Sequence, residues 1–196
     1  MSQNRRLLNN KPTNTLEKNT LDHVWKRCKD ADRKSQSLLY HHFAPRMYAI
    51  CLRYANTTLE AEDMLQTGFI KVFGRHDQYD EKGSLEGWIK RIMINNAIEI
   101  LRKNRMNFYD IDDCTQVLVG ESDVGHDPTA YHDLMQLIKG LPTGYRTVFN
   151  MYVIEGYSHK EIANLLNMSE GNSKSQLSRA RAWLKEKLSK TEELKK

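Results

Sequence analysis

The stretch YSHKEIANLLNMSEGNSKSQLSRARAWLKEKL, residues 157–188, carries the signals of two helices joined by a tight turn. Ser158 and Glu161 precede an apolar run at the spacing of a capping box, in which each side chain satisfies the other residue's free backbone N–H. Asn167 tolerates the positive φ that a tight turn requires, and Ser169 can cap a second helix. The stretch therefore predicts a helix-turn-helix.

The second predicted helix divides into an apolar stripe and a basic face. The stripe, which helical spacing turns inward, comprises Leu177, Ala180, Leu184 and Leu188. The opposite face has no acid before Glu186, which suits contacts to phosphates and to base edges in a major groove. A solvated basic face on an ordinary helical hairpin is the alternative, but capping box, turn and basic face together favour DNA binding. The face comprises Lys174, Ser175, Ser178, Arg179, Arg181 and Lys185.

The chain has 196 residues, enough for two small domains or one of ordinary size. Its formal net charge of +5 favours an acidic partner. No apolar run approaches the roughly 20 residues of a membrane span, and the polar start has no signal-peptide core. We therefore expect a cytoplasmic protein without a membrane span.

Charge is distributed in three blocks along the chain. Residues 1–105 carry a net charge of +7, residues 106–138 carry −7, and residues 139–196 carry +5. This pattern predicts two basic modules joined by an acidic connector. Because no strand-like alternation persists in either module, we predict an all-α protein made of two small helical domains.

The first module contains start signals for four helices. Thr20 can cap the first helix, and a second runs from about residue 32 to residue 54, with Pro45 as a kink or break. Thr57 and Glu60 are spaced as a capping-box pair, and Ser84 can cap a further helix. Helical spacing gives the expected core as Leu38, Leu39, Phe43, Met47, Ile50, Cys51, Tyr54, Leu59, Met64, Leu65, Ile70, Phe73, Leu85, Ile89, Ile92 and Leu101.

Two features of the first module permit more than one interpretation. An acidic stripe that includes Asp63 and Gln66, with Phe69 expected at the surface, is either ordinary solvation or a protein-docking face. Trp88 stands at the start of a helix, where tryptophan most often belongs to a core. A tryptophan among Lys, Arg and Asn is also typical of platforms that stack unpaired bases.

Nothing in the sequence favours catalysis. The three cysteines are odd in number and far apart, so neither a disulfide framework nor a zinc site follows. Cys28 and Cys51 are expected in the core, and the adjacent His41 and His42 are expected to be one packed and one solvated. No nucleophile–base set, Gly-rich phosphate loop or metal-ligand spacing is present, so we expect no catalytic, cofactor or metal site and no small-molecule substrate.

From about Leu21 to Leu188 the chain resembles the extracytoplasmic-function (ECF) group of bacterial sigma factors. In the first half, EAEDMLQTGFIKVF is similar to the family's A-E-D-x-x-Q-x-x-F helix. The run from Trp88 to Arg102 is similar to its W-I-x-x-I-x-x-N-x-x-x-(acid)-x-x-R pattern. The second half contributes LPTGYRTVFNMYVIEGYSHKEIANLLNMSEGNSKSQLSRAR. The resemblance implies a sigma factor that binds core RNA polymerase and directs promoter recognition, DNA melting and transcription initiation.

The resemblance also implies roles for individual residues. Asp63, Gln66 and Phe69 would belong to the surface that docks on the polymerase clamp. Trp88, Lys90, Arg91 and Asn95, with the loop of residues 76–84, would open and hold the downstream promoter element. Lys174, Ser175, Ser178 and Arg179 would read the upstream element, while Arg181 and His159 would contact phosphates. The chain departs from the common family pattern at four positions. The family commonly has Asp at the position of Glu99, Thr at Asn172, Val at Ser173 and a basic residue at Gln176.

The implied organisation has four parts. Residues 1–18 form a disordered tail, residues 19–105 form sigma region 2, residues 106–129 form an acidic linker through the polymerase cleft, and residues 130–190 form sigma region 4. Core RNA polymerase, promoter DNA and an inhibitory anti-sigma factor are the implied partners. Two other classes stay open: a helix-turn-helix regulator that binds duplex DNA without polymerase, and a polymerase-binding adaptor that does not read DNA.

Overall fold

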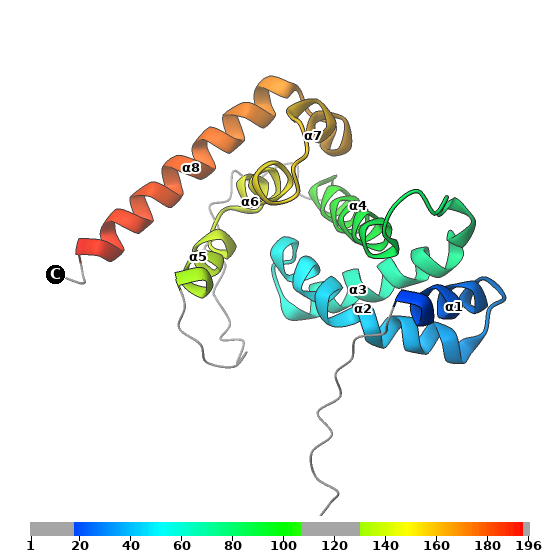
Figure 1. The fold of residues 1–196 in the computed structure, drawn as a ribbon. Helices are drawn as coiled ribbons and strands as arrows, with labels where there is room; N and C mark the ends of the chain where they lie inside the picture. Colours follow the sequence, from blue (N-terminus) through cyan, green and yellow to red (C-terminus); the bar gives the residue numbers. More distant parts are fainter. Residues whose placement is uncertain (1–17, 107–129, 194–196) are drawn as a thin grey trace, which may run out of the picture.

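The computed structural model describes residues 18–106 and 130–193, and within these ranges every regular element is helical (Figure 1). The predicted all-α fold is therefore confirmed. Apart from Lys18 and Met106, the predicted tail and acidic linker lie outside the described residues, as does Cys114. Among the described helices, none combines the length and apolar character needed to cross a membrane.

The first domain consists of helices that pack around α2. Its elements are α1 (Lys18–Lys29), α2 (Arg33–Tyr54), α3 (Thr58–Gly74), the short 3-10 helix η1 (His76–Gln78) and α4 (Leu85–Met106). Helices α2, α3 and α4 all contact one another, and α1 lies against α2.

The predicted helix starts are largely correct. The Thr57 side chain accepts a hydrogen bond from Glu60 N at 3.1 Å, and Ser84 Oγ accepts one from Gly87 N at 3.0 Å. Asp32 caps α2 in the same way, and α2 continues without a break through Pro45. The prediction that Thr20 caps the first helix is wrong, because α1 begins at Lys18 and Thr20 lies inside it.

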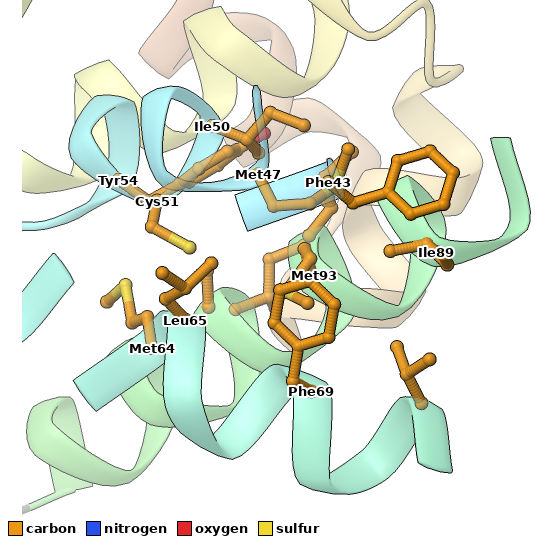
Figure 2. Packing of buried hydrophobic residues seen from close by; sticks show 14 of the residues in the cluster. Phe43, Met47, Ile50, Cys51, Tyr54, Met64, Leu65, Phe69, Ile89 and Met93 are labelled. Carbon is orange, nitrogen blue, oxygen red and sulfur yellow. The ribbon is translucent and has the colours of Figure 1, made fainter. Parts of the chain in front are cut away.

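The core of the first domain is built where α3 and α4 approach closely. Figure 2 shows Phe43, Met47, Met64, Leu65, Phe69, Ile89 and Met93 converging there, and all are buried. A Cβ atom added to Gly68 would lie 2.2 Å from Met93 Sδ, so only glycine fits without a shift of Met93. The buried Asn96 side chain joins the two helices by donating to Met64 O at 2.8 Å and Thr67 Oγ1 at 2.7 Å.

The predicted face of α3 was wrong at three positions. Leu59 and Ile70, which were expected in the core, are 67% and 70% exposed, whereas Phe69 is only 3% exposed. The buried positions repeat at helical spacing as Ala61, Met64, Leu65, Gly68, Phe69 and Val72. Small residues therefore form part of the buried face. A prediction based only on large apolar residues places that face incorrectly. Leu38 of α2, also expected in the core, is 52% exposed.

The second domain contains the helix-turn-helix and three further elements that precede it in the chain. Its elements are α5 (Ala130–Lys139), α6 (Thr143–Phe149), a π-helical turn η2 (Asn150–Ile154), α7 (His159–Leu166) and α8 (Glu170–Glu193). Helix α8 packs on α5, α6 and α7. Gly156 adopts φ +79 after η2, a backbone conformation that glycine tolerates without strain. Leu188 is 43% exposed, contrary to prediction, because the end of α8 projects beyond its neighbours (Figure 1).

The two domains lie side by side. Helix α6 contacts the end of α2, and α7 contacts α4 (Figure 1). Val148, Met151, Ile162 and Leu177 of the second domain belong to the same apolar cluster as the core of the first domain. Cys28 and Cys51 are buried as expected, and burial raises the pKa of the Cys51 thiol to about 12. His42 is buried and His41 exposed, which confirms the expected division of that pair.

Candidate nucleic-acid interface

The predicted capping box at the start of α7 is fully formed. Ser158 Oγ accepts a hydrogen bond from Glu161 N at 3.3 Å, and Glu161 Oε2 accepts one from Ser158 N at 2.8 Å. The Glu161 carboxylate also accepts a hydrogen bond from Ser158 Oγ at 2.7 Å. The bonds from Ser158 N–H and Oγ lower the pKa of Glu161, and the positive charge of Arg91 on α4 lowers it further. The start of α7 is thus fixed by local hydrogen bonds.

The turn between α7 and α8 has the predicted geometry. Asn167 adopts the left-handed conformation, with φ 52 and ψ 54, and its N–H donates to Ala163 O. Ser169 Oγ accepts from Asn172 N at 3.1 Å and caps α8. The two helices of the motif are therefore held at a fixed angle by backbone geometry and caps rather than by a long loop.

The outer face of α8 is exposed, as predicted. Leu177, Ala180 and Leu184 are buried against the rest of the domain. The predicted DNA-reading side chains point away from that stripe and are all exposed: Lys174, Ser175, Ser178, Arg179 and Arg181. This face presents three cations and two hydroxyls, which are the kinds of donor that contact phosphates and base edges in a major groove.

Two departures from the family pattern have structural consequences in the motif. Ser173 is buried, and its Oγ lies 2.9 Å from His159 Nδ1, so a hydroxyl–imidazole hydrogen bond replaces an apolar contact between α7 and α8. Gln176 is 7% exposed and donates to Asn172 Oδ1 at 3.4 Å. A side chain buried in this way serves packing, so the family's cation at that position has no counterpart here.

His159 has two neighbours that limit how it can contact DNA. Its ring stacks on Tyr152 with centroids 4.4 Å apart, and its Nδ1 is engaged by Ser173. A phosphate contact by His159 would therefore use Nε2. The stacked Tyr152 ring holds that imidazole in place.

The predicted downstream-element residues lie in the N-terminal half of α4. Arg91 and Asn95 are exposed, and Lys90 is partly exposed. The Trp88 ring packs edge-on against Trp25 at 5.5 Å and lies 5.4 Å from Tyr79, so the geometry supports the packing interpretation of this tryptophan. Trp88 remains partly exposed, and its role toward DNA stays a prediction.

Two of the three predicted polymerase-docking residues are exposed, and the third is buried. Asp63 and Gln66 are exposed on α3. Phe69 is buried, with its ring 4.7 Å from that of Tyr40, so its expected place at the surface is wrong. The exposed positions Leu59, Asp63, Gln66 and Ile70 follow one another at helical spacing on the outer face of α3.

Glu99 joins α3 to α4 at the edge of the domain. Its carboxylate is 2.7 Å from Lys71 Nζ and 2.9 Å from Lys103 Nζ. Hydrogen bonds from Lys71 and then Lys103 lower the pKa of Glu99 to about 2. Glu99 thus keeps the negative charge of the family's usual aspartate, and its longer side chain bridges α3 and α4.

Sequence reasoning missed a set of polar residues between the domains. Arg146 is 0% exposed, and the Glu155 side chain is 1% exposed and ion-paired to Arg53 and Lys90. Asn150 is also fully buried. Isolated charged or amide residues in the sequence carry no periodic signal of burial, so only the packing of the two domains reveals them.

Two family models match the chain, one in each domain. The model described as Sigma-70 region 2 matches residues 39–106, which include most of α2 and all of α3 and α4. The model described as Sigma-70, region 4 matches residues 131–184, which include the helix-turn-helix.

Relatives with similarity to the chain span both domains. The RNA polymerase sigma-E factor of Streptomyces avermitilis is 32% identical over 130 residues, which cover 66% of this chain and 72% of that protein. The ECF RNA polymerase sigma factor SigW of Bacillus subtilis is 28% identical over 175 residues, covering 83% and 94%. The ECF RNA polymerase sigma factor SigE of Mycolicibacterium smegmatis is 30% identical over 157 residues, covering 78% of this chain and 61% of SigE. The chain therefore belongs to the ECF group of the sigma-70 family of RNA polymerase sigma factors.

Proposed function

We propose that this sigma factor docks on core RNA polymerase through its first domain and directs it to promoters by contacting one DNA element with each domain. The observation that carries the proposal is the exposed basic face of α8 on a fully formed helix-turn-helix. The chain acts by positioning polymerase and DNA and performs no chemistry itself. A cytoplasmic location belongs to the same proposal.

The second domain reads the upstream element with α8 in the major groove. Ser175 and Arg179 lie one turn apart on the outer face, where they reach base edges. Lys174 and Arg181 lie on the flanks and contact phosphates, together with His159. Because several cations take part, binding weakens steeply as salt rises.

The first domain holds the downstream element along α4. Lys90 and Arg91 supply cations for the backbone of an opened strand, and Asn95 can donate to a base. Trp88 is anchored by two neighbouring rings, so only its exposed part is available for a base contact.

Polymerase docking uses the outer face of α3. Asp63 and Gln66 provide polar contacts, and the exposed Ile70 provides the apolar contact that the sequence had suggested for Phe69. An exposed apolar side chain beside polar groups is typical of a docking surface. An anti-sigma partner belongs to this proposal through family membership alone.

In vitro transcription tests the function. The purified chain is mixed with bacterial core RNA polymerase and a pool of promoter fragments, and transcripts are sequenced. Initiation at a defined subset of promoters is expected with the wild type, with little from the Asp63→Ala, Ile70→Ala double variant. Lack of any promoter preference, together with retarded duplex fragments when polymerase is absent, would instead favour a polymerase-independent regulator.

A further inference from the structure

His159 is held between a hydroxyl of α8 and an aromatic ring of η2. Its Nδ1 lies 2.9 Å from Ser173 Oγ, and its ring stacks on Tyr152 with centroids 4.4 Å apart and planes inclined by 22°. Ser173 is fully buried, whereas His159 is half-buried as the first residue of α7. The imidazole is therefore fixed on two sides although it lies at the edge of the protein.

The π-helical turn of η2 supplies one of these two sides. Single π-helical turns are frequent at functional sites. This turn carries Tyr152, and the chain that leaves it is fixed by a hydrogen bond from Tyr157 N to Met151 O at 2.9 Å. The Tyr152 side chain is 37% exposed, so it is not a core residue. It stands at the surface as a wall beside His159.

The Nε2 atom of His159 is the ring nitrogen that a ligand can use. In the part of the chain that the structure describes, Nδ1 has a partner and Nε2 has none. A neutral imidazole carries one N–H, so its Nε2 donates only when Nδ1 is the acceptor. A hydroxyl donates to such an Nδ1 and also accepts from a protonated imidazolium. Ser173 is therefore compatible with both states in which Nε2 carries a proton.

The surroundings of His159 suit an anion. At the start of a helix the first backbone N–H groups lack intrahelical partners, and the dipole is positive there. Lys160 and Lys174 are exposed beside this start, one on each helix of the motif. The acid of this turn, Glu161, is engaged by the N–H and the hydroxyl of Ser158. A phosphate is the anion that duplex DNA presents to such a group of donors.

Ser173 is one of the departures from the family pattern, in which valine is common at this position. A buried hydroxyl is costly unless it is hydrogen-bonded, and packing between two helices is achieved as well by an apolar side chain. Valine would occupy the same space but could neither donate to nor accept from an imidazole. The hydroxyl of Ser173 therefore provides His159 with an orientation that the usual residue does not provide.

We propose that Ser173 is a positioning residue for DNA binding, whose hydroxyl orients His159 so that Nε2–H donates to a phosphate beside the upstream element. The proposal rests on the proposed function, to which the duplex contact of the second domain belongs. In the alternative, the hydroxyl–imidazole bond only fastens α7 to α8. The first case makes the effect of Ser173 on DNA binding depend on His159, and the second does not.

A matched pair of substitutions in the full-length protein separates the hydroxyl from the shape of the side chain. Ser173→Val and Ser173→Thr introduce side chains of the same shape, and only the second keeps the hydroxyl. His159→Phe keeps a flat ring to stack on Tyr152 and removes both nitrogens. Ser189→Ala is the control, because it removes an exposed hydroxyl elsewhere on α8 that donates to backbone carbonyls. Circular dichroism and thermal melting establish that each variant is folded.

Two readouts are used, both without polymerase. Fluorescence anisotropy measures the affinity for a labelled duplex of mixed sequence, since a phosphate contact does not depend on sequence. In the free protein, ¹⁵N NMR of the histidine rings in mildly alkaline buffer, where histidine is neutral, reports whether Nδ1 of His159 accepts a hydrogen bond.

Ser173→Val is expected to bind the duplex about fivefold more weakly than the wild type, the scale of one net hydrogen bond, and Ser173→Thr within about twofold of it. In the His159→Phe background, Ser173→Val should cause no further loss, because the imidazole that it orients is absent. The Nδ1 resonance should shift in Ser173→Val and stay close to its wild-type position in Ser173→Thr. The Ser189→Ala control should change neither readout.

Several results would overturn the proposal. Equal weakening by Ser173→Val with and without His159→Phe would show that the hydroxyl does not act through the imidazole. Unchanged affinity in Ser173→Val, or equal losses in Ser173→Val and Ser173→Thr, would show that the hydroxyl has no part in binding. An Nδ1 resonance that ignores Ser173→Val would show that the bond does not form in solution. Since polymerase is absent throughout, failure of promoter-directed transcription would count against the proposed function and leave these results standing.

Discussion

The two domains place their functional side chains on helices in different ways. In the first domain, α3 and α4 each carry core residues on one face and proposed polymerase or DNA contacts on another, because these helices pack against several neighbours. In the second domain, the helices α5 to α7 support a single long helix, and the reading face of α8 lies wholly on its outer side. In the first domain, residues proposed for function therefore alternate along one helix with residues that stabilise the fold. In the second domain, the two kinds of residue lie on opposite sides of α8.

The largest expected effect compares neighbours on α3. Phe69→Ala should lower the free energy of unfolding by about 3–5 kcal/mol, because it empties a site in the core. Ile70→Ala should change it by less than about 0.5 kcal/mol, since Ile70 is exposed, yet weaken polymerase binding. Urea denaturation and a polymerase pull-down measure the two effects. Equal destabilisation by both substitutions would refute the assignment of faces on α3.

Because α3 and α4 approach closely, a side chain at position 68 should destabilise the protein. Gly68→Ala should lower the free energy of unfolding by about 1–3 kcal/mol through overpacking against Met93. Gly74→Ala is the control, because nothing lies within 4 Å of its added Cβ atom. Shortening the side chain by Met93→Ala should cost less in the Gly68→Ala background than in the wild type. Additive effects in the denaturation series would mean that the two side chains do not compete for space.

In the second domain, a substitution on the outer face of α8 should weaken DNA binding without changing stability. Arg179→Ala should weaken binding to an upstream-element duplex by about 1–3 kcal/mol and relax sequence preference at the bases it contacts. Fluorescence anisotropy on a set of duplex variants measures both effects, with Lys190→Ala near the end of α8 as the control. The melting temperature should stay at the wild-type value. A uniform loss on every duplex would restrict Arg179 to phosphate contact.

The smallest effect concerns the bridge between α3 and α4. The folded-state pKa of Glu99 is about 2, below its ordinary value of 4.5, so its bridge stabilises the fold above pH 4.5 and is lost as pH falls toward 2. Because the side chain is 38% exposed, solvent screening limits the contribution to about 0.5 kcal/mol. Denaturation of wild type and Glu99→Gln should differ near pH 7 and converge in acid. A difference that does not vary with pH would exclude the charge as its cause.

What the sequence could predict follows the same division between the domains. Capping residues and the outer face of α8 were predictable, because a helix packed on one side has a single apolar stripe and local start signals. The face of α3 was not, because Ala61 and Gly68 help to define it and Ile70 imitates a core residue. The contacts of Arg146 and Glu155 between the domains could not be predicted for another reason. Their partners Tyr54 and Lys90 lie more than 50 residues away in the chain, and no local sequence pattern encodes such contacts.

The most direct test of the account is a footprint on a promoter selected by the transcription assay. The account predicts two protected regions and permanganate-reactive, melted bases at the downstream one, only when the chain and core polymerase are both present. Arg179→Ala should weaken the upstream protection first. A single protected duplex site, formed by the chain alone and unaffected by polymerase, would contradict the assignment of one promoter element to each domain.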